Sequence, residues 1–491
     1  MKKLSIKFIS FMLVASLLIC SSFSIGAIGY NVDEDITRVN TTFYGDSKTT
    51  KGFCWYTSDE CNSDVQVVPT ASFNGSFNNA VTFSGTGREF KGNYFHKVDI
   101  DSLQPGTEYA YRVGDASANS WSDIGKFVTD GNDNKFSFIA IADVQASNRE
   151  NFAKAAKVMQ SAIDTCPEAE FVINLGDYVN DCTNDEWDWF FDEFKFANMS
   201  MTSVPVAGNH DGNLKWNWFN NLFNLNSPEG SSTTTGVYYS FDYGNAHFAV
   251  LNSNDMYPMS QQQINWLKND MNASDADWKI VLLHRSLYSA GKNINKPDTL
   301  IMRNVLIPVI DELGIDVVMA GHDHMYMRTH QVKNDAVVED VDYITEYYKG
   351  EEIVFASNPD GTVNILPSTA GTKRYAVNDN AISPIPEAAA EAFSTRDWGG
   401  CYTTVTIDND KFIYKAYIRD DETGEIELVD EYAIKKTMGQ NTVDPNYEPL
   451  PTDFYSNIMP NITSFVTEFT KVLSKYLFVI VPALIKDAIG L

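Results

Sequence analysis

Basic residues are scarce in this chain. Its 491 residues include 37 lysines and arginines against 65 aspartates and glutamates, which gives a formal net charge of −28. A protein this acidic repels a phosphate backbone, which argues against sequence-independent nucleic-acid binding. Apolar residues make up 44% and charged residues 21%, so the composition also excludes a disordered or collagen-like chain. An anionic ligand would need a local positive charge, and a bound metal ion is an obvious source of one.

Long hydrophobic runs are also missing, because the apolar stretches near the two ends are too short to span a bilayer comfortably. Three lysines within the first seven residues precede an apolar run over 8–20, and small residues follow at 24, 26 and 27. This pattern predicts a cleaved signal peptide over 1–27 and a secreted or cell-surface protein. Two alternatives stay open. The run could be a retained N-terminal anchor, or residues 17–20 could form a lipoprotein box in which Ile19 replaces the usual small residue.

The C-terminal region, residues 444–491, reads as a linker followed by an apolar tail. Prolines at 445, 449 and 451 mark the linker. Beyond it, apolar residues recur at helical spacing, and the stretch over 476–485 is apolar with one internal proline. We expect either a helix that docks on the body of the protein or a tail that makes a weak contact with a membrane surface or a protein partner.

Cysteine is sparse, with six residues in the chain. Removal of the signal peptide also removes Cys20 and leaves five, an odd number that cannot all pair within one molecule. Cys54 with Cys61, and Cys166 with Cys182, are the candidates closest in sequence. Both pairings stay open, because a disulfide depends on geometry that the sequence does not give.

The region between the two ends divides into two parts with different hydrophobic patterns. Residues 35–128 alternate apolar and polar side chains over short runs separated by turns, which predicts an all-β sandwich. This part contains His96 but no group of ligand-type residues at metal-binding spacing, so we interpret His96 as a structural residue. Residues 136–437 alternate short buried strands with helical stretches, which predicts an α/β domain.

Polar residues follow five of the predicted strands of the second part. These strands are expected over 138–142, 171–175, 204–207, 279–283 and 317–320. Ligands bind at the carboxyl ends of strands in an open α/β sheet, so the residues that follow are expected to meet at one edge. The candidates at these positions are Asp143, Gln145, Asp177, Asn180, Asn209, His210, Asp211, His284, His322 and His324.

The candidates are oxygen and nitrogen donors without a thiolate, a set that suits Fe, Mn or Zn better than Ca²⁺ or a structural zinc site. They outnumber the ligands of one ion, and one carboxylate shared between two ions would use them all. Four of the seven histidines of the chain fall in these motifs. A single Gly-Asp or Gly-Asn is usually only a turn. Five such motifs in order, each after a strand, indicate a two-metal site of the kind used for displacement at phosphorus.

Together the motifs resemble those of the calcineurin-like metallophosphoesterase superfamily. In order they read Asp143-x-Gln145, Gly176-Asp177, Gly208-Asn209-His210-Asp211, His284 and Gly321-His322-x-His324. Within the superfamily, residues 35–435 resemble the purple acid phosphatases. Segments 96–98, 103–107 and 111–115 are similar to the N-terminal fibronectin-III-like domain of that group, and segments 238–245 and 321–328 to its catalytic domain. The resemblance implies a fibronectin-III-like sandwich followed by a four-layer α/β/β/α metallophosphoesterase domain.

The resemblance also implies a role for each motif residue. The first metal ion would be held by Asp143, Asp177 and His324, and the second by Asp177, Asn209, His284 and His322, so that Asp177 bridges the two. His210 would face the phosphate as an acid or hydrogen-bond donor, and Asp211 would orient its imidazole. Asn209 and Arg285 would also contact the substrate.

Two positions depart from the family pattern. Coloured members have a ligating tyrosine where Asn180 stands, and other members have a histidine where Gln145 stands. The amide oxygens of Asn180 and Gln145 are weaker, neutral donors for the first metal ion. We therefore expect a colourless enzyme with Zn, Mn or ferrous iron at that position. The histidines that plant members carry shortly after position 284 are also missing, which leaves Lys292 or Arg285 to contact substrate. Two interpretations of Arg285 stay open, a substrate contact and a surface residue.

The resemblance implies an exported phosphatase that cleaves phosphate monoesters with a metal-bound hydroxide at a centre of two divalent or trivalent ions, Fe, Zn or Mn. The chain has neither a Gly-x-Ser-x-Gly motif nor a P-loop, which argues against acyl transfer and NTPase chemistry. The partner would be a small phosphorylated substrate. Two alternatives stay open: a phosphodiesterase or nucleotidase that uses the same site, and a catalytically weak cell-surface binding protein.

Overall fold

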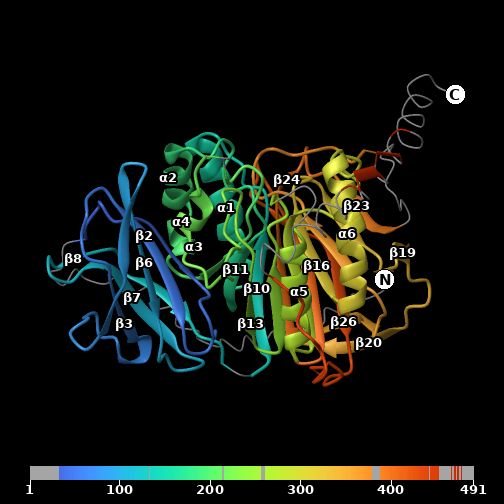
Figure 1. The fold of residues 1–491 in the computed structure, drawn as a ribbon, viewed down its shortest axis with the longest axis horizontal. Helices are drawn as coiled ribbons and strands as arrows, with labels where there is room; N and C mark the ends of the chain where they lie inside the picture. Colours follow the sequence, from blue (N-terminus) through green and yellow to red (C-terminus); the bar gives the residue numbers. More distant parts are fainter. Residues whose placement is uncertain are drawn as a thin grey trace, which may run out of the picture.

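The computed structural model describes residues 32–131, 133–212, 215–255, 260–378, 388–441 and 443–452, with a few separate positions between 466 and 477. The predicted signal peptide and most of the predicted tail lie outside the described residues. A β-sandwich occupies one end of the molecule, and strands covered by helices make up the rest (Figure 1). Among the described residues, no helix is both long and apolar enough to cross a membrane.

The N-terminal part is a β-sandwich, as its alternating pattern predicts. One layer contains β4, β3, β7 and β8, with β9 also paired to β7, and the other contains β1, β2, β6 and β5. Buried side chains such as Phe53, Val65 and Tyr111 fill the space between the layers. The strands are Thr37–Thr42 (β1), Lys51–Thr57 (β2), Asp64–Pro69 (β3), Val81–Ser84 (β4), Thr86–Phe90 (β5), Asn93–Ile100 (β6), Glu108–Asp115 (β7), Ser120–Trp121 (β8) and Gly125–Val128 (β9).

His96 is a buried structural residue of this sandwich, as the sequence suggests. Its two ring nitrogens each lie 2.8 Å from a hydroxyl oxygen, those of Thr57 and Ser63, and its ring stacks on Trp55. Burial lowers the pKa of His96 to about 4, so the ring is neutral near pH 7.

The larger sheet of the molecule runs through both parts of the chain. β1 lies parallel to β12 (Thr202–Pro205), with Thr42 opposite Ser203. The strand order is β20-β21-β26-β25-β24-β10-β11-β12-β1-β2-β6-β5. The hydrophobic pattern indicates two bodies, and the backbone joins them edge to edge, which fixes the sandwich against the α/β domain.

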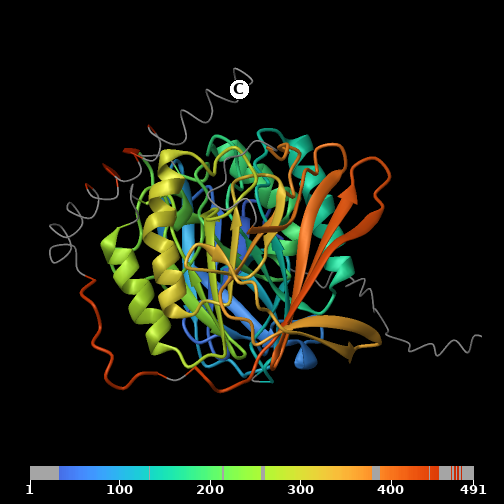
Figure 2. The same cartoon turned by 90° about the vertical axis from the view of Figure 1, so that its right-hand side faces the viewer.

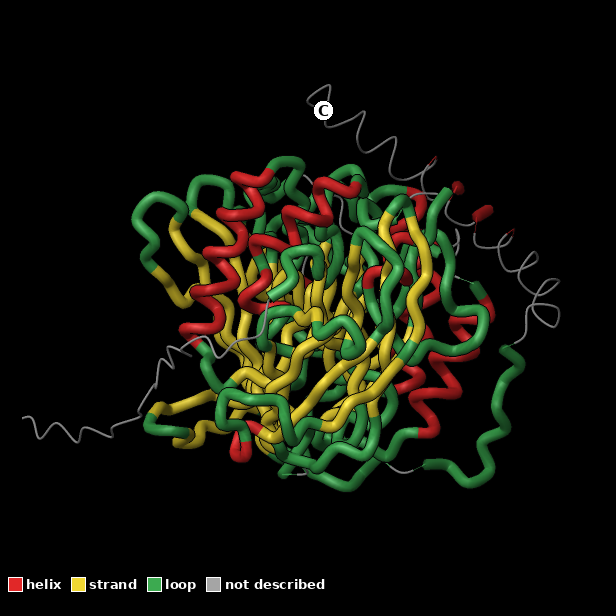
Figure 3. Tube along the Cα trace, turned by 90° about the vertical axis from the view of Figure 1, so that its left-hand side faces the viewer, coloured by secondary structure: helices red, strands yellow, loops and turns green. Residues whose placement is uncertain are grey.

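The α/β domain has the predicted four layers. The larger sheet packs against a second mixed sheet with the order β13-β14-β15-β16-β22-β17-β23. Helices α1–α3 lie on the outer side of the larger sheet and α5 and α6 on the outer side of the second sheet, so that helices flank the strands on two sides (Figures 1 and 3). Aromatic rings fill the space between the sheets. For example, Phe171 lies 5.0 Å from Phe138 and 5.9 Å from Phe248 between ring centroids.

The remaining elements have the following bounds. The helices are Arg149–Thr165 (α1), Asn184–Glu193 (α2), Lys195–Asn198 (α3), Trp218–Leu222 (α4), Gln261–Ala273 (α5) and Pro297–Leu313 (α6). The other strands of the larger sheet are Lys135–Ile141 (β10), Ala169–Asn174 (β11), Tyr343–Tyr348 (β20), Glu351–Ser357 (β21), Gly399–Asp408 (β24), Lys411–Asp420 (β25) and Ile426–Lys435 (β26). The second sheet contains Tyr239–Tyr243 (β13), Ala246–Val250 (β14), Trp278–Arg285 (β15), Val317–Gly321 (β16), Tyr326–Thr329 (β17), Val363–Pro367 (β22) and Ala389–Phe393 (β23). A small separate pair is Val332–Lys333 (β18) and Ala336–Val337 (β19).

Local sequence signals explain several helix ends. The side chain of Asn148 accepts a hydrogen bond from the amide of Asn151 and caps α1. α6 begins at a proline and ends at Gly314, whose φ of 62° places it in the left-handed region. Ser260 caps α5 through the amide of Gln263, and the Gln263 side chain bonds to the backbone of Asn252 instead of returning to Ser260.

The described cysteines form no disulfide. All five cysteines after residue 31 are free, and neither the pair Cys54 and Cys61 nor the pair Cys166 and Cys182 is bonded.

Linker residues 443–452 run back along α5, where Asn269 accepts hydrogen bonds from the Leu450 amide and the Tyr447 hydroxyl. The hairpin of β20 and β21 projects at the outer edge of the larger sheet (Figure 2).

Candidate metal centre

The ends of five strands bring six of the predicted ligands together. These are Asp143 after β10, Asp177 after β11, Asn209 after β12, His284 near the end of β15, and His322 and His324 after β16. Two groups of side chains have ligand atoms within 4.8 Å of one another: Asp143, Asp177 and His324 form one, and Asp177, His284 and His322 form the other. Asp177 belongs to both groups, which is the arrangement that a carboxylate shared between two ions requires.

Short contacts link the donors of the two groups. His284 Nε2 lies 3.3 Å from Asp177 Oδ2 and 3.2 Å from the amide oxygen of Asn209. His324 Nε2 lies 3.3 Å from Asp143 Oδ1. Asn209 therefore joins the group that contains His284, the position that the family resemblance implies for it.

Backbone carbonyls set the orientation of two of the imidazoles. His284 Nδ1 donates to the carbonyl oxygen of Leu175 at 2.8 Å, and His324 Nδ1 donates to that of Lys373. Both rings consequently direct Nε2 to the carboxylates, the usual way in which a second contact orients a ligating histidine. His322 Nε2 is buried and has no hydrogen-bond partner among the described residues. A metal ion would supply the missing partner of that nitrogen.

Glycines next to the donors allow the strand ends to pack closely. A Cβ on Gly208 would lie 2.0 Å from the Asp177 nitrogen, and a Cβ on Gly321 would lie 2.8 Å from Asp143 Oδ2. A side chain at either position would displace a predicted ligand. The Gly-Asn and Gly-His motifs thus have a steric reason as well as a turn-forming one.

The backbone of the site is strained at the donors themselves. Asp143, Asp177 and His322 have φ angles of 53°, 52° and 77°, in the left-handed region that non-glycine residues rarely adopt. Such strain costs on the order of 1–3 kcal/mol for each residue and is concentrated at functional sites. Here it turns successive side chains toward one point.

The charges of the buried donors perturb one another. Burial by itself would raise the pKa of Asp177, but the charge and hydrogen bond of His284 lower it well below its ordinary value. Burial lowers the pKa of His322 far below normal, and the charge of His284 lowers it further. Buried carboxylates are costly unless cations compensate their charge. The donor set therefore fits metal ions.

The two departures from the family pattern lie in different settings. Gln145 is 5% exposed, and neither atom of its amide group has a hydrogen-bond partner among the described residues. It is thus able to supply a neutral oxygen ligand close to Asp143. The backbone carbonyl oxygen of Asn180, not its side-chain amide, accepts a hydrogen bond from His210 Nδ1. Tyr178 is packed among aromatic rings, 5.0 Å from Phe190 between centroids, and does not replace the missing tyrosine ligand.

The predicted role of Asp211 is wrong. Its carboxylate accepts hydrogen bonds from the backbone amides of Asp177, Tyr178 and Gly208, at 2.7–2.8 Å, and none from the ring of His210. Burial and the charge of Asp177 raise the pKa of Asp211 to about 7. Asp211 fixes the two strand-end turns of the site, whereas His210 is oriented by a backbone carbonyl.

Basic residues at the rim of the site differ in their availability. Arg285 forms an ion pair with Asp298 at 2.6 Å, so the guanidinium is already engaged. Lys292 lies over the ring of Tyr375, with 4.0 Å between the ammonium and the ring centroid. Tyr375 in turn stacks on His324 at 4.5 Å.

The sequence interpretation missed Lys373 and Tyr375. Both come from the loop that follows β22, a further buried strand parallel to β16. The strand-end rule applied to residues 363–367 would have found this loop. It was overlooked because the loop has no histidine or carboxylate to mark it.

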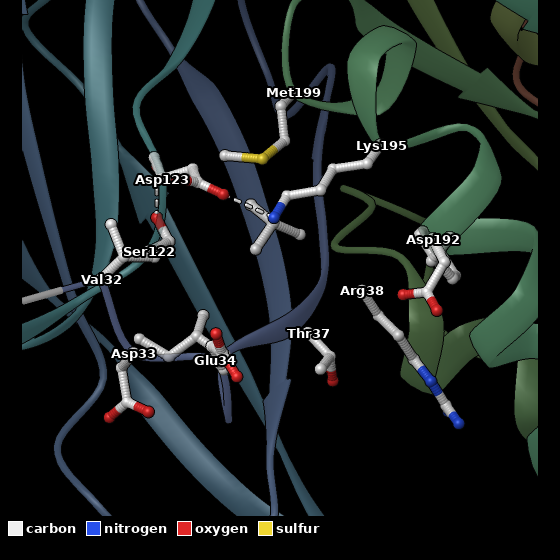
Figure 4. Close-up of a pocket in the computed structure, with 13 residues that line it drawn as sticks. Val32, Asp33, Glu34, Thr37, Arg38, Ser122, Asp123, Asp192, Lys195 and Met199 are labelled. Carbon is white, nitrogen blue, oxygen red and sulfur yellow. Dashed lines mark hydrogen bonds and ion pairs between the residues drawn. The ribbon is translucent and has the colours of Figure 1, made fainter.

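A separate cavity of about 370 Å³ lies between the sandwich and the helices α2 and α3. Ile36, Val39 and Met199 line part of it, and Lys195 reaches across to Asp123 (Figure 4). None of the predicted site residues lines this cavity.

Two family models match the chain. Residues 136–326 match the calcineurin-like phosphoesterase model, and residues 36–129 match the model of the purple acid phosphatase N-terminal domain. Acid phosphatase type 7 from Danio rerio is 23% identical over 389 residues, which cover 71% of this chain and 79% of that protein. Purple acid phosphatase 1 from Ipomoea batatas is 27% identical over 267 residues, which cover 50% of this chain and 53% of that protein.

Two solved structures share the fold. The purple acid phosphatase PPD1 from yellow lupin seeds has a TM-score of 0.61 at 15% sequence identity, and the match covers 82% of this chain and 74% of that one. The structure of PhoD has a TM-score of 0.61 at 12% identity, and the match covers 91% of this chain and all of the other.

Fold, donor set and comparisons define a metallophosphoesterase, and hence a hydrolase. The N-terminal domain narrows the class further. The chain combines a calcineurin-like phosphoesterase domain with a purple acid phosphatase N-terminal domain and is a purple acid phosphatase-like phosphatase.

Proposed function

We propose that the protein is an exported phosphatase that hydrolyses small phosphate monoesters at a dinuclear metal centre. The observation that carries the proposal is the pair of overlapping donor groups that share Asp177. Asp143, Asp177 and His324 would hold one ion, with the amide oxygen of Gln145 in reach. The second ion would be held by Asp177, Asn209, His284 and His322.

Two metal ions at such a site neutralise the charge of a phosphate ester and lower the pKa of a bound water from about 15.7 to near 7. The chain adds position and proton transfer. Asp177 accepts a hydrogen bond from the His210 amide at 2.8 Å, which holds this residue beside the shared carboxylate. Because the Asn180 carbonyl can only accept, His210 Nδ1 carries a proton. Nε2 of the protonated ring is then available to donate to the phosphate or to the leaving oxygen.

The predicted metal identity follows from the neutral donors. Gln145 and Asn180 offer no phenolate, so we expect Zn, Mn or ferrous iron, and a protein without a strong visible charge-transfer band. An absorption spectrum of the purified protein measures this directly. An intense visible band would contradict the proposed ligand set.

Export is part of the proposal and rests on the predicted signal peptide. Expression of the full chain in a host with a secretory pathway should deliver the protein to the medium or the cell surface, with an N-terminus near residue 28. The same preparation allows the predicted weak membrane contact of the tail to be measured by flotation with lipid vesicles. An uncleaved chain inside the cell would overturn the export proposal.

The decisive activity assay compares a nitrophenyl phosphate monoester with the corresponding bis-ester. We expect faster turnover of the monoester. Replacement Asp177→Asn should abolish turnover, because it removes the negatively charged carboxylate that both groups share, whereas Asp192→Asn on α2 should leave turnover unchanged. A preference for the bis-ester would favour the phosphodiesterase alternative. Metal loading without any turnover would favour the binding protein.

A further inference from the structure

Two lysines next to the metal centre have no carboxylate partner among the residues that the structure describes. Within the described residues, no carboxylate oxygen lies within 4.0 Å of the ammonium of Lys292 or Lys373. Other lysines of this acidic protein are paired, such as Lys195 with Asp123 and Lys333 with Asp360. In a chain with a net charge of −28, two unpaired ammonium groups at the site mark a local positive patch.

Lys373 is fixed to a predicted metal ligand through its backbone. Its carbonyl oxygen accepts the hydrogen bond from His324 Nδ1. Two residues later, the amide of Tyr375 donates to the His324 carbonyl at 3.0 Å, and the two rings stack with 15° between their planes. The loop after β22 is therefore attached to the His324 turn on both sides of Arg374.

Lys292 is held by a different loop that packs on the same turn. A Cβ on Gly291 would lie 2.6 Å from Asp323 Cγ, which shows how closely the loop approaches. The amide of Asn293 donates to Asp323 Oδ1 at 3.2 Å. Lys292 stands between these two anchored residues, and its ammonium lies over the ring of Tyr375. The loop that carries Lys292 and the loop that carries Lys373 thus both pack on the turn of His322–His324.

The placement of the two lysines favours an anionic ligand. The loops that carry them pack on the turn of His324, so cations bound at the centre would add positive charge beside these two ammonium groups. An anionic ligand is then the group that can compensate them.

We propose that Lys292 and Lys373 bind a second anionic group, a phosphate or a carboxylate, on the leaving portion of the substrate. The preferred substrates are then phosphate monoesters that carry another negative charge. This inference rests on the proposed phosphatase function and names its substrate class. Arg285 is unsuited to the same role, because Asp298 already pairs with it.

The test compares substrates that differ only in the second anion. Phenyl phosphate and 4-carboxyphenyl phosphate form one pair, and glucose 6-phosphate and glucose 1,6-bisphosphate form the other. For the unmodified protein we expect kcat/KM to be higher for the substrate with the extra charge. In the double variant Lys292→Gln, Lys373→Gln this preference should fall about tenfold, the effect of two partly exposed charge pairs. The double control variant Lys154→Gln, Lys157→Gln, which removes two positive charges from α1, should leave the ratio unchanged.

Each outcome either supports or overturns the proposal. A fall confined to the carboxylate pair or to the bisphosphate pair supports the proposal and identifies the anion. An unchanged ratio in the double variant, with metal content retained, overturns it. Equal losses for both members of a pair also overturn it, because the lysines would then act on the phosphate that is cleaved. Failure of the unmodified protein to hydrolyse any of the four esters would instead overturn the proposed function, and the inference with it.

Discussion

Buried histidines of the sandwich and of the metal centre differ in the hydrogen-bond partners of their ring nitrogens. His96 has a hydroxyl partner at each ring nitrogen and a pKa lowered to about 4. His322 is also buried, but its Nε2 lacks a partner among the described residues and lies in a group with Asp177 and His284. A buried nitrogen without a partner costs on the order of 1–3 kcal/mol. Both ring nitrogens of His96 therefore have hydrogen-bond partners in the folded protein, whereas His322 Nε2 would gain its partner from a bound metal ion.

The largest effect is expected from a methyl group placed at the centre. In Gly208→Ala the new Cβ would lie 2.0 Å from the Asp177 nitrogen, so the shared carboxylate must move. Because displacements of about 1 Å can cost 100-fold in rate, we expect at least a 100-fold loss of kcat/KM together with loss of metal. Steady-state kinetics and metal analysis measure both.

The matched control lies in the sandwich. Gly92 has a positive φ of 83°, unlike Gly208, and a Cβ there would meet no atom within 4 Å. Gly92→Ala should lower the free energy of unfolding by about 1 kcal/mol through backbone strain and leave activity unchanged. Full activity and full metal content in Gly208→Ala would contradict the close packing of the strand ends.

Removal of a core side chain tests whether damage to the sandwich affects stability without affecting the metal centre. Phe53 is fully buried between the sandwich layers. Phe53→Ala should lower the free energy of unfolding by about 3–5 kcal/mol, measured by urea denaturation. The fraction that stays folded should retain its metal ions and its kcat. Selective loss of metal from a fully folded variant would show that the sandwich supports the centre directly.

A further buried histidine, His247, allows the effect of pH on stability to be compared with that at His96. His247 lies between Asp242 and Asp270, at 2.7 Å and 2.9 Å, and these carboxylates raise its pKa to about 9 against the lowering effect of burial. Because the folded pKa exceeds that of the unfolded chain, the stabilisation is fully present below about pH 6.5 and is lost as the pH rises toward 9. His247→Gln should therefore cost up to about 3 kcal/mol at pH 6 and little above pH 9.

His96→Gln provides the contrasting profile in the same urea experiment. The pKa of His96 is lowered on folding, so its contribution is present above about pH 6.5 and is lost as the pH falls toward 4. Parallel pH profiles for the two variants would refute the assigned environments.

The smallest effect is expected at Gln145. If its unpartnered amide supplies an oxygen ligand, Gln145→Ala should weaken one of two bound ions by about tenfold, or ~1.4 kcal/mol, as measured by equilibrium dialysis. Gln145→His should strengthen the same ion. Identical affinities in all three proteins would remove Gln145 from the ligand set.

Much of the fold could be predicted, because strand alternation and the switch to helical spacing are local signals. The sandwich and the α/β domain followed from such patterns. The join between β1 and β12 could not, since Thr42 and Ser203 are far apart in sequence and neither residue type signals pairing.

The candidate ligands could be identified for a related reason. Asp143, Asp177 and His322 each follow a recognisable apolar strand. Their positions after successive strands therefore identify them as residues of one site. The role of Asp211 was wrong because sequence adjacency to His210 says nothing of where a carboxylate points. Lys373 was missed because a lysine after a strand is ordinary until its neighbours are known.

Metal stoichiometry, combined with anomalous diffraction, tests the central claim most directly. After chelation and reconstitution with Zn²⁺ or Mn²⁺, we predict two ions per chain, with one anomalous peak beside Asp143 and His324 and the other beside His284 and His322. Both peaks should contact Asp177. A single ion, or two ions that do not share Asp177, would contradict the dinuclear centre.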